Sequence, residues 1–345
     1  MSSYAFWNNK GGVGKSFLCF VAAAEYAHRH KDTDVYVIDL CPQANVSETL
    51  LGGAPNSPRV MNSLLIKTPR ATVAGYLEER LSSPFKMIPD VEPYVTNPSE
   101  FNTALSENLY LICGDNLLEL LSEAIRQTSQ LAIPTNAWKL VLSWIRDLMG
   151  ALRERSGDRD SMFILDCNPS FAIYTQLALV AADYVVVPFT ADDSSRRGIE
   201  NVVALLYGQG EDPHTATYAR LSFSKRAKEE GLTIPRLHTF VSNRVTMYEG
   251  KPSKAFDAMS KTIKATLDKI HLKHRSIFAN PKESPSTSFV NVPDYHGACI
   301  VAATTGTPIH RLKAGPRMIG EERVQLNPDP LASYRKALGQ FVDCL

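Results

Sequence analysis

Asn9-Lys10-Gly11-Gly12-Val13-Gly14-Lys15-Ser16 is the most informative segment of this 345-residue chain. It follows a short apolar run, residues 4–7, and precedes a run rich in apolar and alanine residues, 17–24. A strand, a glycine-rich turn and a helix in this order form a phosphate-binding loop, because glycines let backbone N–H groups turn inward and the helix N-terminus adds positive potential. We therefore expect Lys15 to reach the outer phosphates of a nucleotide and the Ser16 hydroxyl to bind Mg2+.

The composition is that of an ordinary globular protein, with 44% hydrophobic and 21% charged residues. No apolar run approaches the length of a membrane span, and the N-terminus lacks a secretory signal pattern. The six cysteines include no C-x-x-C pair, which favours reduced thiols over disulfides or a zinc site. We expect a single domain over residues 1–345 and a cytoplasmic location.

Four further apolar runs predict buried strands, at residues 34–39, 162–166, 184–188 and 237–243. Helical stretches separate these runs, and continuous apolar strands are typical of parallel sheets with both faces covered. The predicted fold is therefore α/β, with three layers and a mostly parallel central sheet covered by helices on both faces. Asp39 and Asp166 end two of the strands at the edge that carries Ser16. Such oxygen ligands suit Mg2+.

Other parts of the chain are less regular or more ambiguous. Prolines interrupt residues 54–110, so we expect short helices and loops there, as an insertion beside the second strand. A strand is predicted at 109–114, and helices at 117–130 and 137–155. A C-terminal helix around 330–345 carries an apolar stripe, which we expect to pack on the body of the protein rather than on a membrane. The residues of this stripe are Leu331, Tyr334, Leu338, Phe341 and Leu345.

Three segments together resemble the ParA family of partitioning ATPases, in the ParA/MinD branch of P-loop NTPases. KGGVGKS at 10–16 is similar to the deviant Walker A motif of that branch. VIDLCPQANVSETLLGG at 37–53 resembles its switch I segment, and FILDCNPSFAIYTQLALVAADYVVVP at 163–188 resembles the Walker B strand and its sequel. Residues 291–293 and 305–308 echo later landmarks, so the resemblance runs over nearly the whole chain.

The resemblance implies an ATPase that uses ATP and Mg2+ and forms a homodimer, in which Lys10 reaches the partner's nucleotide. Its implied catalytic positions are Lys10, Lys15, Asp39 and Cys41. Its implied metal ligands are Ser16, Asp39 and Asp166. Its implied nucleotide contacts, including an adenine contact from Asn243, are Lys10, Gly11, Gly12, Val13, Gly14, Lys15, Ser16, Phe17, Asn243 and Pro293.

The chain departs from the family pattern at Cys41. Relatives carry an aspartate there that helps to position or activate the attacking water. A neutral thiol is a weak donor and a poor acceptor, so hydrolysis should slow by roughly two to four orders of magnitude while nucleotide binding is spared. One alternative function is therefore an ATP-binding switch or clamp with little hydrolysis, and another is a MinD-like membrane-associated regulator.

A basic stretch suggests a polyanionic partner, although the net charge of the chain is only +1. Residues 220–282 hold 14 Lys and Arg against 5 Asp and Glu. Members of the family bind DNA without sequence preference through basic surface residues, as phosphate contacts allow. We expect such binding here, with association with the nucleoid as a consequence, and a ParB-like adaptor or cargo protein as a further partner. The candidate DNA-binding residues, predicted along one side of a helix, are Lys251, Lys254, Lys261 and Lys264.

Overall fold

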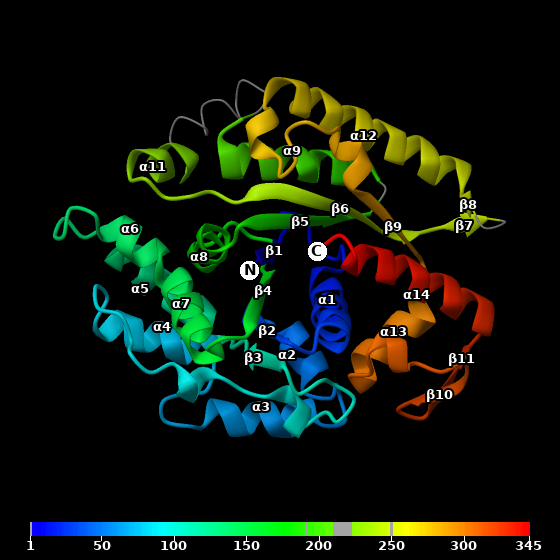
Figure 1. Ribbon diagram of the computed structural model, residues 1–345, viewed down its shortest axis with the longest axis horizontal. Helices are drawn as coiled ribbons and strands as arrows, with labels where there is room; N and C mark the ends of the chain where they lie inside the picture. The colour runs from blue at the N-terminus through cyan, green and yellow to red at the C-terminus, as the bar shows by residue number, and fades with distance from the viewer. Residues whose placement is uncertain (1, 191, 210–222, 249–250) are drawn as a thin grey trace.

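The computed structural model describes residues 2–190, 192–209, 223–248 and 251–345 (Figure 1). Within these residues, seven strands form one sheet in the order β3-β2-β4-β1-β5-β6-β9, and every neighbouring pair is parallel. The strands of this sheet are β1 (Ser2–Phe6), β2 (Thr33–Leu40), β3 (Leu109–Ile112), β4 (Asp160–Cys167), β5 (Tyr184–Phe189), β6 (Arg236–Val245) and β9 (Phe289–Pro293). Two small hairpins lie outside it, formed by β7 (Met247–Tyr248) with β8 (Lys251–Pro252) and by β10 (Gly315–Ile319) with β11 (Glu322–Leu326).

Helices cover both faces of the sheet, so the molecule has three layers (Figure 1). One face packs against α1 (Lys15–Arg29), α2 (Asn45–Leu50), α3 (Ser57–Leu65), α13 (His296–Thr305) and α14 (Pro328–Val342). The other packs against α4 (Val73–Ser82), α5 (Leu117–Thr128), α6 (Ala137–Leu142), α7 (Trp144–Ser156), α8 (Ile173–Ala181), α9 (Asp193–Tyr207), α11 (Phe223–Glu229) and α12 (Lys254–Lys273). The predicted α/β fold class is confirmed.

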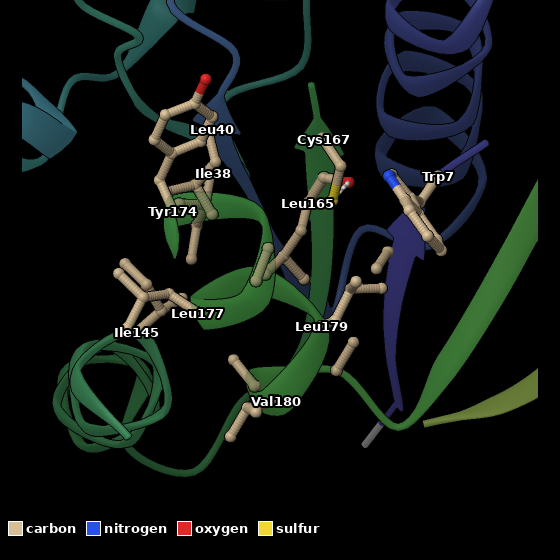
Figure 2. Packing of buried hydrophobic residues seen from close by; sticks show 14 of the residues in the cluster. Trp7, Ile38, Leu40, Ile145, Leu165, Cys167, Tyr174, Leu177, Leu179 and Val180 are labelled. Atoms are coloured by element: carbon tan, nitrogen blue, oxygen red, sulfur yellow. Dashed lines mark hydrogen bonds between the residues drawn. The ribbon is translucent and has the colours of Figure 1, made fainter. Parts of the chain in front are cut away.

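Two apolar cores hold the layers together, one on each face of the sheet. Along β1 and the residue after it, Tyr4 and Phe6 join one core, and Ala5 and Trp7 join the other. Side chains alternate in this way because successive residues of a strand point to opposite faces. Figure 2 shows part of the core beneath α8, where Leu177 faces the helix α7. Burial on both faces explains why these strands are continuous apolar runs in the sequence.

The helix predicted at 137–155 is in fact two helices, α6 and α7, which meet at Ser143. The Ser143 hydroxyl donates to the carbonyl of Lys139 at 2.8 Å, and its N–H bonds to the carbonyls of both Lys139 and Leu140. Serine that bonds back onto the preceding turn bends helices. The apolar spacing continues through the break, so periodicity alone predicted one helix.

The segment 54–110 contains α3, α4 and two short 3-10 turns, and its backbone is tied to β3. Val73 N donates to the carbonyl of Cys113 at 2.8 Å, and Thr96 forms a two-way bridge with Leu111. Sequence analysis did not predict three later elements: β9, α13 and the β10–β11 hairpin. Strand β9 was noted only as a short landmark, because it is an edge strand with polar Asn291 within it.

The C-terminal helix α14 packs on the body of the protein, as expected. Leu331, Tyr334, Leu338 and Phe341 are each at most 2% exposed and join the core that contains α1. The stripe is therefore used for packing within the chain. Among the described residues, no helix has both the length and the apolar character needed to cross a bilayer.

Candidate functional site

The glycine-rich loop connects β1 to α1 at the carboxyl edge of the sheet. Gly12 and Gly14 have φ angles of 74° and 88°, a left-handed backbone that favours glycine. A Cβ on Gly14 would lie 2.2 Å from Asn243 Nδ2, so only glycine fits at this position. The loop therefore has the conformation of a phosphate-binding turn, with the N-terminus of the 15-residue helix α1 directly behind it.

Lys15 is held within this loop and is only 7% exposed. Its Nζ donates to the backbone carbonyls of Asn8 at 3.3 Å and Lys10 at 3.1 Å. Burial lowers the pKa of Lys15, while the charge of Asp166 acts in the opposite direction. The ammonium group is thus placed beneath the loop before any phosphate arrives.

Asp39 and Asp166 are neighbours across β2 and β4 and are both fully buried. Burial raises the pKa of both carboxyl groups, and the charge of Asp166 raises that of Asp39 further. Within the described residues, Asp166 Oδ2 has no hydrogen-bond partner. Ser16 lies close enough to Asp166 to lower its pKa by hydrogen bonding. An unpartnered carboxylate oxygen beside a hydroxyl is a donor set that fits Mg2+.

Asp39 is already committed to hydrogen bonds. Its Oδ1 accepts from Cys41 N at 3.0 Å, and its Oδ2 accepts from the backbone N–H (3.2 Å) and the hydroxyl (2.7 Å) of Ser47. The Ser47 hydroxyl in turn accepts from Gly114 N at 2.9 Å. Asp39 therefore anchors the segment that resembles switch I. Sequence reasoning missed Ser47, whose signal was a hydroxyl eight residues after the strand-ending aspartate.

A cavity of about 490 Å3 opens above the loop. Cys41 lines it in place of the expected aspartate, and Cys41 is 6% exposed. Burial, followed by the charges of Asp39 and Asp166, raises the pKa of the Cys41 thiol to about 12. The thiol is therefore neutral near pH 7 and cannot serve as a base. The other polar side chains that line the cavity are Lys15, Ser16, Gln43, Asn45, Glu48, Thr49, Cys167, Arg244 and Thr304.

Lys10 points away from the cavity above its own loop. Its Nζ contacts Asp192 Oδ2 at 2.5 Å, Thr190 Oγ1 at 3.0 Å and Ser195 Oγ at 3.3 Å. Burial alone would raise the pKa of Asp192, but hydrogen bonds from Lys10 and nearby hydroxyls hold it well below its ordinary value. Lys10 is thus separated from the place where the outer phosphates of its own nucleotide would lie.

Asn243 and Pro293 lie beside the loop, as the resemblance implies, but the Asn243 amide is already engaged. Its Nδ2 donates to the carbonyl of Val13 at 3.0 Å, and its Oδ1 accepts from Arg244 N at 3.0 Å. Together with Phe17 and Pro293 it lines a second, small cavity of about 20 Å3. In this structure Asn243 braces the phosphate loop, and an adenine contact from it stays a prediction.

The four candidate DNA-binding lysines do not form one free helix face, which corrects the prediction. Lys251 belongs to β8 rather than to a helix, because Pro252 follows it and α12 begins only at Lys254; the side chain of Lys251 lies outside the described part. Lys261 pairs with Asp257 at 2.7 Å, and the ammonium of Lys264 lies 5.0 Å from the ring centroid of Phe289. Lys254 is exposed. The beginning of the basic stretch, within 210–222, lies outside the described residues.

Residues 143–208 match the model of a family described as an AAA domain. This segment covers α7, β4, α8, β5 and α9, including Asp166 at the end of the Walker B-like strand. A comparison with curated protein sequences finds no match.

Three solved structures share the fold of this chain over 84% to 100% of its length. A McdA variant from Cyanothece in complex with ATP superposes with a TM-score of 0.59 and 15% identity, over 98% of this chain and 96% of that one. A putative plasmid partition protein from Borrelia burgdorferi bound to AMPPNP gives 0.56 and 16%, over 100% and 99%. The ParA protein of pNOB8 gives 0.51 and 14%, over 84% and 80%. The resemblance seen in the sequence is thus confirmed at the level of the fold: this chain has the three-layer fold of the ParA-type P-loop ATPases.

Proposed function

We propose that this protein is an ATP-dependent dimerising ATPase that positions or partitions DNA or another cargo. The observation that carries the proposal is the cavity above the phosphate loop, which Lys15 and Ser16 line. The fully buried Asp166 lies next to Ser16, and its Oδ2 has no hydrogen-bond partner among the described residues. These groups supply a cation for the phosphates and oxygen ligands for Mg2+. The bound Mg2+ would neutralise phosphate charge.

Closure of a face-to-face homodimer is the proposed response to ATP. Lys10 supports this part, since its side chain lies at the surface beside its own loop and is bonded to Asp192, whose side chain is 46% exposed. A lysine placed this way can exchange one anionic partner for another. In the closed dimer, each Lys10 would leave Asp192 and contact the partner's nucleotide.

Slow hydrolysis is the expected weakness of this ATPase. The neutral Cys41 thiol stands where a carboxylate would orient the attacking water. The second candidate function is therefore a switch or clamp that binds ATP and scarcely hydrolyses it. The neutral thiol of Cys41 favours this second function, because a cysteine at position 41 leaves the phosphate loop itself unchanged.

Non-specific DNA binding by the closed dimer is a further part of the proposal. Lys254 supports it, being exposed at the beginning of α12 and free of ion pairs with described residues. Binding through phosphates should weaken steeply as the salt concentration rises. DNA affinity that does not change with salt, or no binding in the presence of ATP, would contradict this part. A MinD-like membrane role loses its support, since the apolar stripe of α14 is buried.

Steady-state ATP hydrolysis by the purified protein, with and without DNA, tests the proposal. Lys15→Ala is the blank, because it removes the ammonium beneath the loop. Turnover above the blank, together with ATP-dependent dimers in sedimentation experiments, supports the positioning cycle. ATP binding without turnover supports the clamp, and absence of ATP binding rejects both. The cargo, a ParB-like adaptor and location at the nucleoid would follow from partner capture by the ATP-bound dimer.

A further inference from the structure

Arg244 has an unusual backbone conformation at the edge of the candidate site. Its φ is 59°, and Ala44 is the only other non-glycine residue with a positive φ in the described ranges. The residue lies where β6 and β9 lose their regular register, between Ser242 and Val245. A left-handed conformation is uncommon for a long side chain, and such residues cluster at ligand sites.

Asn243 fixes this conformation and ties it to the phosphate loop. Its Oδ1 accepts from Arg244 N at 3.0 Å, while its Nδ2 donates to the carbonyl of Val13 at 3.0 Å. Asn243 is only 4% exposed, and Gly14 packs so closely against its amide that no Cβ would fit. The position of the Arg244 backbone is therefore set by the same amide that braces the loop.

The side chain of Arg244 is exposed and lines both cavities. Lys15 and Arg244 are the two Lys or Arg residues that line the larger cavity, and the Lys15 ammonium is bonded to carbonyls. The guanidinium of Arg244 makes no hydrogen bond or ion pair with any residue that the structure describes. Glu48 lines the larger cavity and Asp294 the smaller one, and within the described part of the chain neither forms a salt bridge with Arg244.

We infer that Arg244 is a nucleotide-binding residue, whose guanidinium contacts the phosphate nearest the nucleoside in a bound nucleoside diphosphate or triphosphate. This inference rests on the proposed nucleotide binding. A guanidinium presents a planar fork that matches phosphate oxygens, and it stays charged at all relevant pH values. Lys15 lies beneath the loop and serves the outer phosphates. Arg244 lies at the boundary between the loop cavity and the small cavity lined by Phe17, so its guanidinium contacts the phosphate nearest the nucleoside.

Isothermal titration of ADP into wild type and five variants tests the inference, and Lys15→Ala serves as the blank for nucleotide binding. Arg244→Gly removes the side chain and suits the left-handed backbone, so it should fold as well as wild type. Arg244→Lys keeps the charge, whereas Arg244→Gln keeps only a planar polar group. Arg59→Ala, an exposed arginine on α3 away from both cavities, is the matched control.

We expect Arg244→Gly and Arg244→Gln to weaken ADP binding about 10- to 100-fold, the loss typical of hydrogen bonds to a charged group. Arg244→Lys should fall between them and wild type, and Arg59→Ala should bind as wild type. Unchanged ADP affinity in Arg244→Gly would overturn this inference but leave the proposed function standing. Tighter binding by Arg244→Gln than by Arg244→Lys would overturn the phosphate contact. If wild type binds ADP no better than Lys15→Ala, the inference and the proposed function both fail.

Discussion

Lys10 Nζ lies 2.5 Å from Asp192 Oδ2, so the lysine expected to act across a dimer is bonded within its own chain. The two residues are 182 positions apart, and Asp192 also caps α9 by accepting from Ser195 N at 2.9 Å. Formation of the proposed closed dimer would therefore require each subunit to break its own Lys10–Asp192 bond. If the chain dimerises as proposed, we expect the Lys10–Asp192 pair to oppose dimerisation until a nucleotide offers Lys10 a better partner.

Asp192→Asn should make ATP-dependent dimerisation easier. Asparagine keeps the helix cap but removes the charge that holds Lys10. The side chains are 27% and 46% exposed, so the pair contributes less than about 1 kcal/mol, and the concentration for half-maximal dimer should fall about two- to fivefold. Sedimentation with ATP measures this. Glu200→Gln removes another exposed ion pair of α9 and should leave dimerisation unchanged. Equal dimerisation of Asp192→Asn and wild type would contradict the prediction.

Ser47→Ala should destabilise the protein and reduce the dependence of nucleotide binding on Mg2+. The fully buried Ser47 hydroxyl donates to Asp39 Oδ2 and accepts from Gly114 N. Leaving such buried groups unpaired costs about 1–3 kcal/mol. Denaturant unfolding measures the loss of stability, and nucleotide binding measured at increasing Mg2+ concentrations shows its dependence on Mg2+. Ser161→Ala is the matched control, because the Ser161 hydroxyl is buried without a partner among the described residues. Equal losses in both variants would show that Ser47 has no specific role.

Cys41→Asp should accelerate ATP hydrolysis. The thiol, with its pKa raised to about 12, is replaced by a carboxylate that can orient water, and a positioned base contributes about 10²- to 10⁴-fold. Phosphate release with saturating ATP and Mg2+ measures the rate. Cys41→Ala should leave the slow wild-type rate unchanged, since a neutral thiol adds little. If Cys41→Ala is slower than wild type, the thiol itself takes part in the reaction.

The parts of the site predicted from the sequence are those that depend on local pattern. Short local patterns predict both features: the glycines predict the phosphate loop, and the apolar runs predict β2 and β4 with the aspartates at their ends. The register of β2 with β4 then places Asp39 beside Asp166, as expected for neighbouring strands. Local pattern therefore located the loop, the carboxylates and the edge of the sheet where they meet.

The parts that the sequence did not predict depend on tertiary contacts. Asp192 bonds to Lys10 because α9 begins beside the loop. Arg244 is a candidate ligand-binding residue because Asn243 holds its backbone at the edge of the site. Lys264 has the spacing of a solvent-facing residue, yet its ammonium lies over the ring of Phe289. A spacing rule identifies the side of a helix but not what packs against that side.

The last prediction concerns Glu25, which lies in α1, the helix that follows the phosphate loop. Its Oε1 accepts from both the ring Nδ1 (2.7 Å) and the backbone N–H (3.0 Å) of His310. Burial alone would raise the pKa of Glu25, but these hydrogen bonds lower it below its ordinary value of about 4.5. Because the folded state binds this proton more weakly than the unfolded state, Glu25 stabilises the fold above pH 4.5. That contribution is lost as the pH falls through the lowered pKa.

Glu25→Gln should therefore reduce the free energy of unfolding by about 1 kcal/mol at pH 7, and the deficit should shrink below pH 4.5. Urea unfolding of both proteins between pH 7 and pH 3.5 measures the difference. Glu48→Gln is a control of opposite sign: burial raises the pKa of Glu48, and its carboxylate has no hydrogen-bond partner in the part of the chain described. Removing that charge should leave stability at pH 7 unchanged or slightly higher. A deficit in Glu25→Gln that stays constant over the whole range would show that packing, and not the ionised hydrogen bond to His310, is what Glu25 contributes.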